Sequence, residues 1–94
     1  MFDISVTDDG DVFLSGRFDA TQVERAREDL GRINSSCRIH FEDLDYIASA
    51  GLGVLLSVQK RLSNNGDSLT LVGLNNHIRE VFKIAGFDQV FKIE

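Results

Sequence analysis

The sequence predicts one α/β domain, in which a mixed sheet of four to five strands has helices packed against it. Short segments with apolar residues at alternate positions indicate strands, and longer segments with apolar residues three and four apart indicate helices. After two opening strands the two kinds of segment alternate, in the order β-β-α-β-α-β-α-β. This order is typical of strands joined by crossover helices. Residues 1–94 are enough for one core and are expected to form a single domain.

The first two strands are expected to form a hairpin. Phe2, Ile4 and Val6 alternate with polar residues, which indicates a strand with one buried face. Residues 8–10, with the sequence Asp-Asp-Gly, provide a turn. An apolar run resumes at residues 12–14, so the two segments are expected to pair.

The first helix is expected to follow the second strand. Its apolar positions lie three and four apart, at Val23, Ala26, Leu30 and Ile33. Charged residues lie between them, which indicates an amphipathic helix. Asp19 or Thr21 is expected to cap its start, and residues 34–36 break it.

The middle of the chain combines a strand, a loop and a strongly apolar helix. Residues 37–41 are expected to form the third strand and residues 42–48 a loop. The second helix is expected from about Ala50 to Ser63. Its apolar residues cover much of its circumference, which predicts deeper burial than for the first helix. Residues 64–66, Asn-Asn-Gly, tolerate left-handed geometry and are expected to end it.

The last third is expected to add a buried strand, a helix and an edge strand. Residues 68–72 form the strand, and Asn75 or Asn76 caps the helix. One helix face is expected to carry Ile78, Val81, Phe82 and Ala85. Gly86 closes this helix, and residues 87–93 are expected to form the edge strand.

Charge and composition narrow the possible functions. Fifteen acidic and ten basic residues give a net charge of −5, which disfavours binding to nucleic acid or to anionic membranes. A basic or neutral protein is a more natural partner. Cys37 is the only cysteine, so the chain has no internal disulfide and no cysteine-based zinc site. Without a signal peptide or a run of 18 apolar residues, a reduced, cytoplasmic protein with no direct membrane insertion is expected.

Catalytic chemistry is not expected. His40 and His77 lie on different predicted elements, and no acidic pair near them has metal-ligand spacing. In the third strand, His40 is either a satisfied interior histidine or part of a polar site near Ser49. The Gly-x-Ser-x-Gly nucleophile elbow is absent around Ser49. We therefore expect a protein that is not an enzyme and needs no metal or cofactor.

Ser49 is the candidate functional residue, because it lies where an extended segment is expected to become an apolar helix. A serine there either caps the helix or carries a phosphate. The positive end of the helix dipole favours an added anion. Gly51 and Gly53 cost helix propensity, about 1 kcal/mol each relative to alanine. They therefore suggest close approach by a neighbouring strand or by a partner protein.

Three motifs in order give the chain a family resemblance. They are Gly16-Arg17-Phe18-Asp19, then Ser49-Ala50-Gly51-Leu52-Gly53-Val54, and then Leu71-Val72-Gly73 with Val81-Phe82 and Gly86-Phe87. With them the chain resembles a STAS domain of the bacterial anti-sigma factor antagonist family over essentially its whole length. The resemblance implies the STAS fold.

The resemblance also implies a switch. Such proteins bind a kinase-fold anti-sigma factor when unphosphorylated, and are released when the kinase phosphorylates the loop serine, which corresponds to Ser49. A cognate phosphatase is a further possible partner. Asp19 is expected near Ser49, where it either orients the hydroxyl or caps the first helix. The implied partner-binding residues are Asp19, Ala48, Ser49, Ala50, Gly51, Leu52 and Gly53.

Two positions depart from the family pattern and support an alternative. Ala48 stands where the family usually has aspartate, and His40 stands where it usually has an acidic or amide residue. In the alternative, the chain is a constitutive STAS subunit of a lipid-transport or other membrane-transport complex, and Ser49 is only a helix cap. The intact serine favours the phosphorylation-controlled switch.

Overall fold

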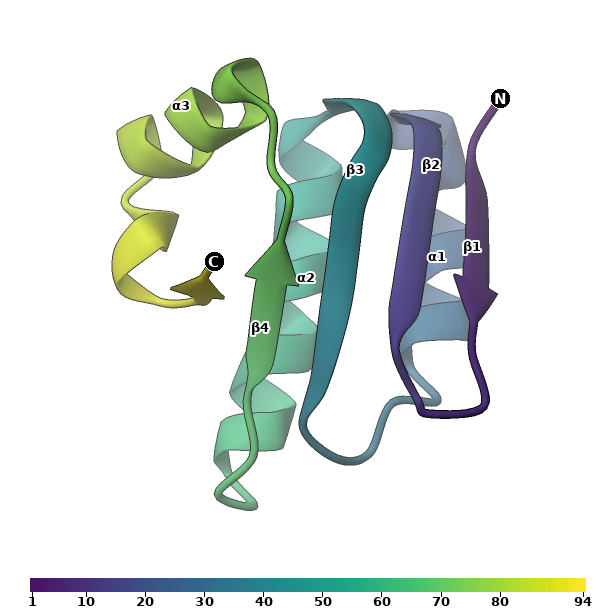
Figure 1. Cartoon of the computed structure of the whole chain (residues 1–94), viewed down its shortest axis with the longest axis vertical. Coiled ribbons are helices and arrows are strands. Elements are labelled where there is room, and N and C mark those ends of the chain that lie inside the picture. Colours follow the sequence, from purple (N-terminus) through teal and green to yellow (C-terminus); the bar gives the residue numbers. More distant parts are fainter.

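A computed structural model describes residues 1–94, and a five-stranded sheet organises them (Figure 1). The strands lie side by side in sequence order: β1 (Asp3–Val6), β2 (Val12–Phe18), β3 (Cys37–Ile47), β4 (Leu69–Val72) and β5 (Lys92–Ile93). β1 runs antiparallel to β2, and each later pair is parallel. The predicted mixed α/β sheet and its opening hairpin are confirmed.

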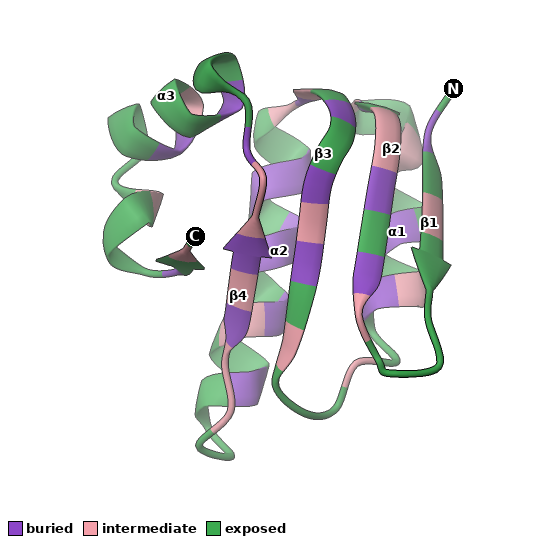
Figure 2. Ribbon diagram, in the orientation of Figure 1, coloured by how far each residue is buried: buried purple, intermediate pink, exposed green.

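Two helices cover one face of the sheet. α1 (Val23–Leu30) and α2 (Ser49–Ser63) lie behind the strands in Figure 1, whereas α3 (Asn76–Ile84) lies beside β4. Two short 3-10 turns, η1 (Ala20–Gln22) and η2 (Phe87–Gln89), precede α1 and follow α3. Figure 2 shows buried and exposed residues alternating along β2 and β3, as expected for a sheet with one covered face.

The core lies between the sheet and the helices and contains 21 apolar side chains. In the part of the core formed by the C-terminal third of the chain, the central residue is Phe82 of α3, which is fully buried. The Phe82 ring meets the rings of Phe41, Phe87 and Phe91 edge to face, with centroids 6.0, 6.3 and 5.8 Å away. This aromatic cluster attaches α3 and η2 to β3.

β3 is longer than the sequence predicted, because residues 42–47 continue the strand instead of forming a loop. Leu44 and Ile47 point into the core, at 1% and 4% exposure, and pair with Gly16 and Phe18 of β2. The acidic residues 42, 43 and 45 are exposed. An acidic segment can therefore remain a strand here, because the outer face of the sheet is open to solvent.

The predicted edge strand at residues 87–93 is wrong over most of its length. Phe87–Gln89 form a 3-10 turn, and only Lys92 and Ile93 pair with β4. The N–H groups of Val90 and Phe91 donate to the Phe87 carbonyl, 3.0 and 3.1 Å away, so this backbone is coiled. Packing of Phe87 and Phe91 against Phe82 explains why the apolar run does not extend.

The helix ends agree in part with their predictions. Asn75 caps α3, since its side chain accepts a 2.8 Å hydrogen bond from the Ile78 N–H. Gly86 is left-handed after α3 and Gly66 after α2, whereas no asparagine adopts this conformation. α1 ends at Leu30, so Ile33 packs against the core from beyond the helix.

Candidate functional site

The candidate site lies where β2 and β3 end side by side. Phe18 and Ile47 are paired, and the next residue, Ala48, donates its N–H to the Phe18 carbonyl at 2.8 Å. β2 then continues into η1, and β3 into α2, while η1 packs against α2. The parallel pairing of β2 and β3 therefore places Asp19 and Ser49 at the same edge of the sheet.

Ser49 is the first residue of α2 and not its cap. Ala48 has the extended N-cap conformation, and its carbonyl accepts the first helical hydrogen bond, from Leu52 at 3.1 Å. The interpretation of Ser49 as a helix cap is therefore wrong by one residue. Ser49 is exposed, and its hydroxyl makes no hydrogen bond within the chain. It lies in the first turn of α2, where the backbone N–H groups have no acceptor within the helix.

Asp19 caps the turn that leads into α1. Its Oδ1 accepts hydrogen bonds from the Thr21 N–H at 3.0 Å and from the Thr21 hydroxyl at 2.5 Å. These bonds, with smaller contributions from the nearby Arg17 and the chain's amino group, lower the pKa of the Asp19 carboxyl. No hydrogen bond joins Asp19 to Ser49. Of the two roles expected for Asp19, this geometry provides the capping role.

Thr21 also lies at this edge of the sheet, although the sequence predicted it only as an alternative to Asp19 for capping the first helix. Its hydroxyl, and not that of Ser49, is held by the Asp19 carboxylate. The Asp-x-Thr spacing is the signal for this local bond, since Asp and Thr side chains commonly bond to backbone two residues away.

Stability at low pH is expected to depend on Asp19. Because its pKa is lower in the folded chain, its stabilising contribution is fully present above about pH 4 and is lost as pH falls through the folded-state pKa. Asp19→Asn keeps an acceptor oxygen but does not titrate there. Urea unfolding across a pH series should therefore show a shallower loss of stability below about pH 4 for this variant. Asp8→Asn, at an exposed hairpin carboxylate, is the matched control; an equal effect from both variants would contradict the prediction.

The two glycines of α2 differ in their surroundings. A Cβ on Gly51 would lie 3.1 Å from Ile47 and 3.2 Å from Phe18, both of which are buried. A Cβ on Gly53 would meet nothing within 4 Å. Close approach by the strands therefore explains Gly51, whereas nothing within the chain explains Gly53.

Gly53→Ala is expected to raise the free energy of unfolding by about 0.5–1 kcal/mol, because alanine favours helix and the space is open. Gly51→Ala should lack this gain, since its methyl group must displace two core side chains. Chemical denaturation of both variants measures the difference. Equal stabilisation by the two substitutions would show that the contacts at Gly51 are not restrictive.

The predicted partner-binding residues are only partly accessible. Ser49, Ala50 and Gly53 are exposed, and Asp19 and Ala48 are half-buried. The remaining two, Gly51 and Leu52, are buried in the core, with Leu52 at 6% exposure. Their direct contribution is to fix the first turn of α2 against the sheet.

His40 does not belong to this edge. It lies seven residues before Ile47 on β3, about 23 Å away along an extended strand. Its Nε2 lies 3.0 Å from Asp11 Oδ2, its Nδ1 lies 3.5 Å from Glu42 Oε1, and its ring stacks on Phe13. His40 is thus half-buried and satisfied on the open face of the sheet, and it forms no polar site with Ser49.

Comparison with known families identifies this fold, in which a serine opens the helix after β3. The family model described as Mlab, STAS domain matches residues 5–93. This chain belongs to the STAS domain family.

Its relatives include bacterial anti-sigma factor antagonists. The anti-sigma-B factor antagonist of Listeria monocytogenes is 29% identical over 92 residues, which cover 94% of this chain and 81% of that protein. BtrV of Bordetella bronchiseptica is 41% identical over 78 residues, which are 79% of this chain, and the match spans 58% of BtrV. The unphosphorylated form of the anti-sigma factor antagonist SpoIIAA matches with a TM-score of 0.73 and 20% identity, over 100% of this chain and 87% of SpoIIAA. The SpoIIAA match supports the fold. The anti-sigma factor antagonists among these relatives belong to a family of non-enzymatic regulators.

No helix of the chain has both the length and the apolar character that crossing a membrane requires.

Proposed function

We propose that this chain is a phosphorylation-controlled partner-switching regulator. In its unphosphorylated state it binds a kinase-fold anti-sigma factor or a related serine kinase, and phosphorylation of Ser49 releases that partner. The observation that carries the proposal is the position of Ser49, exposed at the start of α2 with an unbonded hydroxyl. The relatives named anti-sigma factor antagonists support the kind of partner.

The chemistry of Ser49 suits such a switch. A phosphate there would add a charge of about −1.5 to −2. The free chain tolerates it, because the N–H groups of the first helical turn and the helix dipole favour an anion. A protein contact formed over the same hydroxyl would not tolerate the phosphate, since the contact would have to bury that charge. The same phosphate is therefore compatible with the fold and incompatible with the complex.

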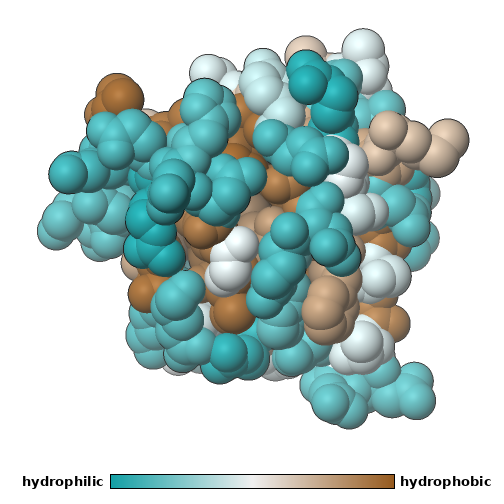
Figure 3. Space-filling model, turned by 45° about the horizontal axis from the view of Figure 1, so that its top comes forward, coloured by the Kyte–Doolittle hydropathy of each residue, from teal (hydrophilic) through white to brown (hydrophobic).

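The surface around Ser49 is suited to a specific protein contact. Ala48, Ala50 and Gly53 keep side chains small around the serine, so a partner can approach the backbone of the first turn. Figure 3 looks toward this end of the molecule and shows small apolar areas among hydrophilic atoms. We infer that the contact with the partner has mixed polar and apolar character. We further infer that it forms in the cytoplasm and that a phosphatase removes the phosphate from Ser49.

The proposal is tested by capture from native lysate with three parallel baits: wild type, Ser49→Ala and Ser49→Asp. Bound proteins and any phosphate on Ser49 are identified by mass spectrometry. Trypsin separates the two exposed hydroxyls of this edge, because cleavage after Arg38 and Lys60 places Ser49 in a different peptide from Thr21. A kinase-fold protein lost only with Ser49→Asp supports switching, whereas equal capture by all three baits overturns it.

A constitutive role in a lipid-transport or other membrane-transport complex is the second candidate. One observation favours it: Ala48, beside Ser49, provides no carboxylate to assist phosphoryl transfer. Membrane-transport subunits retained by all three baits would support this role. Ser49 would then be a surface residue without a capping function, because Ala48 occupies the N-cap.

A further inference from the structure

A cavity of about 450 Å³ lies at the other end of the molecule from Ser49. It opens between the β1–β2 hairpin and the segment that joins α1 to β3. Its apolar wall consists of Val6, Val12, Ile33 and Cys37. This volume is within the range that small ligands occupy in proteins.

The wall of the cavity is held in place by hydrogen bonds from α2 and from the segment just before β4. Arg61 of α2 donates to the Ile33 carbonyl at 2.6 Å and to the Leu30 carbonyl at 3.4 Å. The Ser36 hydroxyl donates to Asp67 at 3.1 Å and accepts from the Ser68 N–H at 3.0 Å. A cavity with a fixed wall loses little conformational freedom when a ligand enters.

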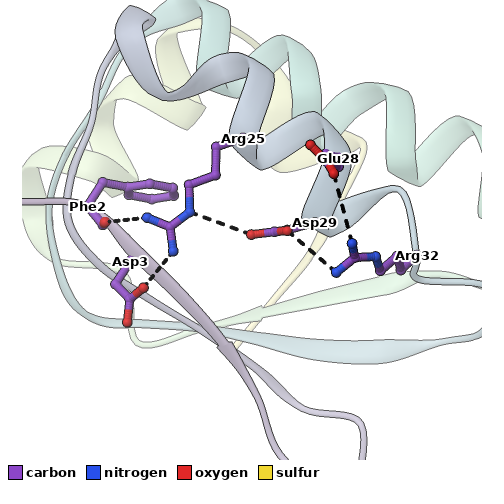
Figure 4. A network of polar contacts seen from close by, with 6 residues as sticks. All are labelled: Phe2, Asp3, Arg25, Glu28, Asp29 and Arg32. Carbon is purple, nitrogen blue, oxygen red and sulfur yellow. Dashed lines mark hydrogen bonds and ion pairs between the residues drawn. The ribbon is translucent and has the colours of Figure 1, made fainter.

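The charge available at the cavity is negative. Two charged residues of the cavity, Asp29 and Arg32, are already paired with each other at 3.7 Å (Figure 4). Arg32 also lies 4.0 Å from Glu28, and Asp29 also pairs with Arg25. Asp9 lines the cavity and has no ion-pair partner.

Cys37 is a further lining residue of the cavity. Burial and the negative charge of Asp11 both raise the pKa of its thiol. The thiol therefore stays neutral and contributes apolar surface.

We propose that this cavity binds a small organic cation, a protonated amine with an apolar body. The body lies against Val6 and Ile33, and the ammonium group pairs with the Asp9 carboxylate at the rim. The site is separate from the Ser49 surface, so it does not depend on the proposed partner.

The test is an NMR titration of the ¹⁵N-labelled chain with 2-phenylethylamine. The matched probes are 2-phenylethanol, which is neutral and of similar size, and 3-phenylpropionate, which is an anion. Saturable shifts are expected for the amides of residues 9–10 and 33–37, with binding of the amine about two- to fivefold tighter than that of the alcohol. The anion should bind more weakly than either.

Two variants test the role of the carboxylate. Asp9→Asn should remove most of the preference for the amine, whereas Asp8→Asn, its neighbour outside the cavity, should retain it. Raising the salt concentration should also reduce the preference. Equal binding of amine and alcohol, or an undiminished preference in Asp9→Asn, would overturn the choice of a cation. Shifts that do not saturate, or that lie elsewhere on the chain, would overturn the site.

Discussion

Ser49→Asp is expected to weaken binding of the proposed kinase-fold partner by about thirtyfold or more. A carboxylate left unpaired in a protein contact costs about 2 kcal/mol or more, and about 1.4 kcal/mol corresponds to a tenfold change. Ser49 is exposed in the free chain, so the same substitution carries no comparable cost there. Titration calorimetry with the purified partner measures the ratio of dissociation constants.

The control for Ser49→Asp is a second exposed serine on the same helix. Ser57 lies eight residues further along α2, about 12 Å away, so Ser57→Asp adds the same charge outside the proposed contact. Ser57→Asp and Ser49→Ala should each bind within about threefold of wild type. Equal losses in Ser49→Asp and Ser57→Asp would show that net charge, and not the position of Ser49, controls binding.

Phe82→Ala is expected to lower the free energy of unfolding by about 3–5 kcal/mol. The ring is fully buried among Phe41, Phe87 and Phe91, and its loss leaves a cavity between α3, η2 and the sheet. This cost is a large part of the stability of an ordinary small domain, about 5–15 kcal/mol. Urea unfolding followed by circular dichroism measures it.

Ile84 provides the matched comparison within α3. Its side chain is 80% exposed, so Ile84→Ala should change stability by less than about 0.5 kcal/mol. A similarly small effect for Phe82→Ala would contradict the view that the aromatic cluster holds α3 and the C-terminal segment in place.

The repeating patterns of the sequence predicted most elements, because each element buries one face. Phe2 and Ile4 of the first alternating segment contact the core, as do the residues spaced three and four apart from Val23 to Leu30. Val6, the last residue of that alternation, is 62% exposed. The patterns failed where other forces act. Residues 42–47 were predicted as a loop because acidic side chains occupy the uncovered side of β3. Residues 87–93 were predicted as a strand because Phe91 is buried in the core and Phe87 packs against it, although the segment is coiled.

The candidate site could be predicted by position but not by contact. The family resemblance and the parallel order of strands indicate that Asp19 and Ser49 share an edge. The path of η1 decides which hydroxyl Asp19 binds. The N-cap of α2 is Ala48 and not the predicted Ser49, because β3 extends to Ile47. The cavity near Asp9 was not predicted, since its walls come from separate turns with no local pattern.

The burial of Gly51 and Leu52 has a consequence for the thermodynamics of association. These two residues fix the turn that presents Ser49, so the free chain already holds that turn in one conformation. A partner that docks there encounters a prepared surface, and little entropy is lost in ordering the backbone. The specificity of the contact can then be decided by the presence or absence of a single phosphate, because few other degrees of freedom change when the complex forms.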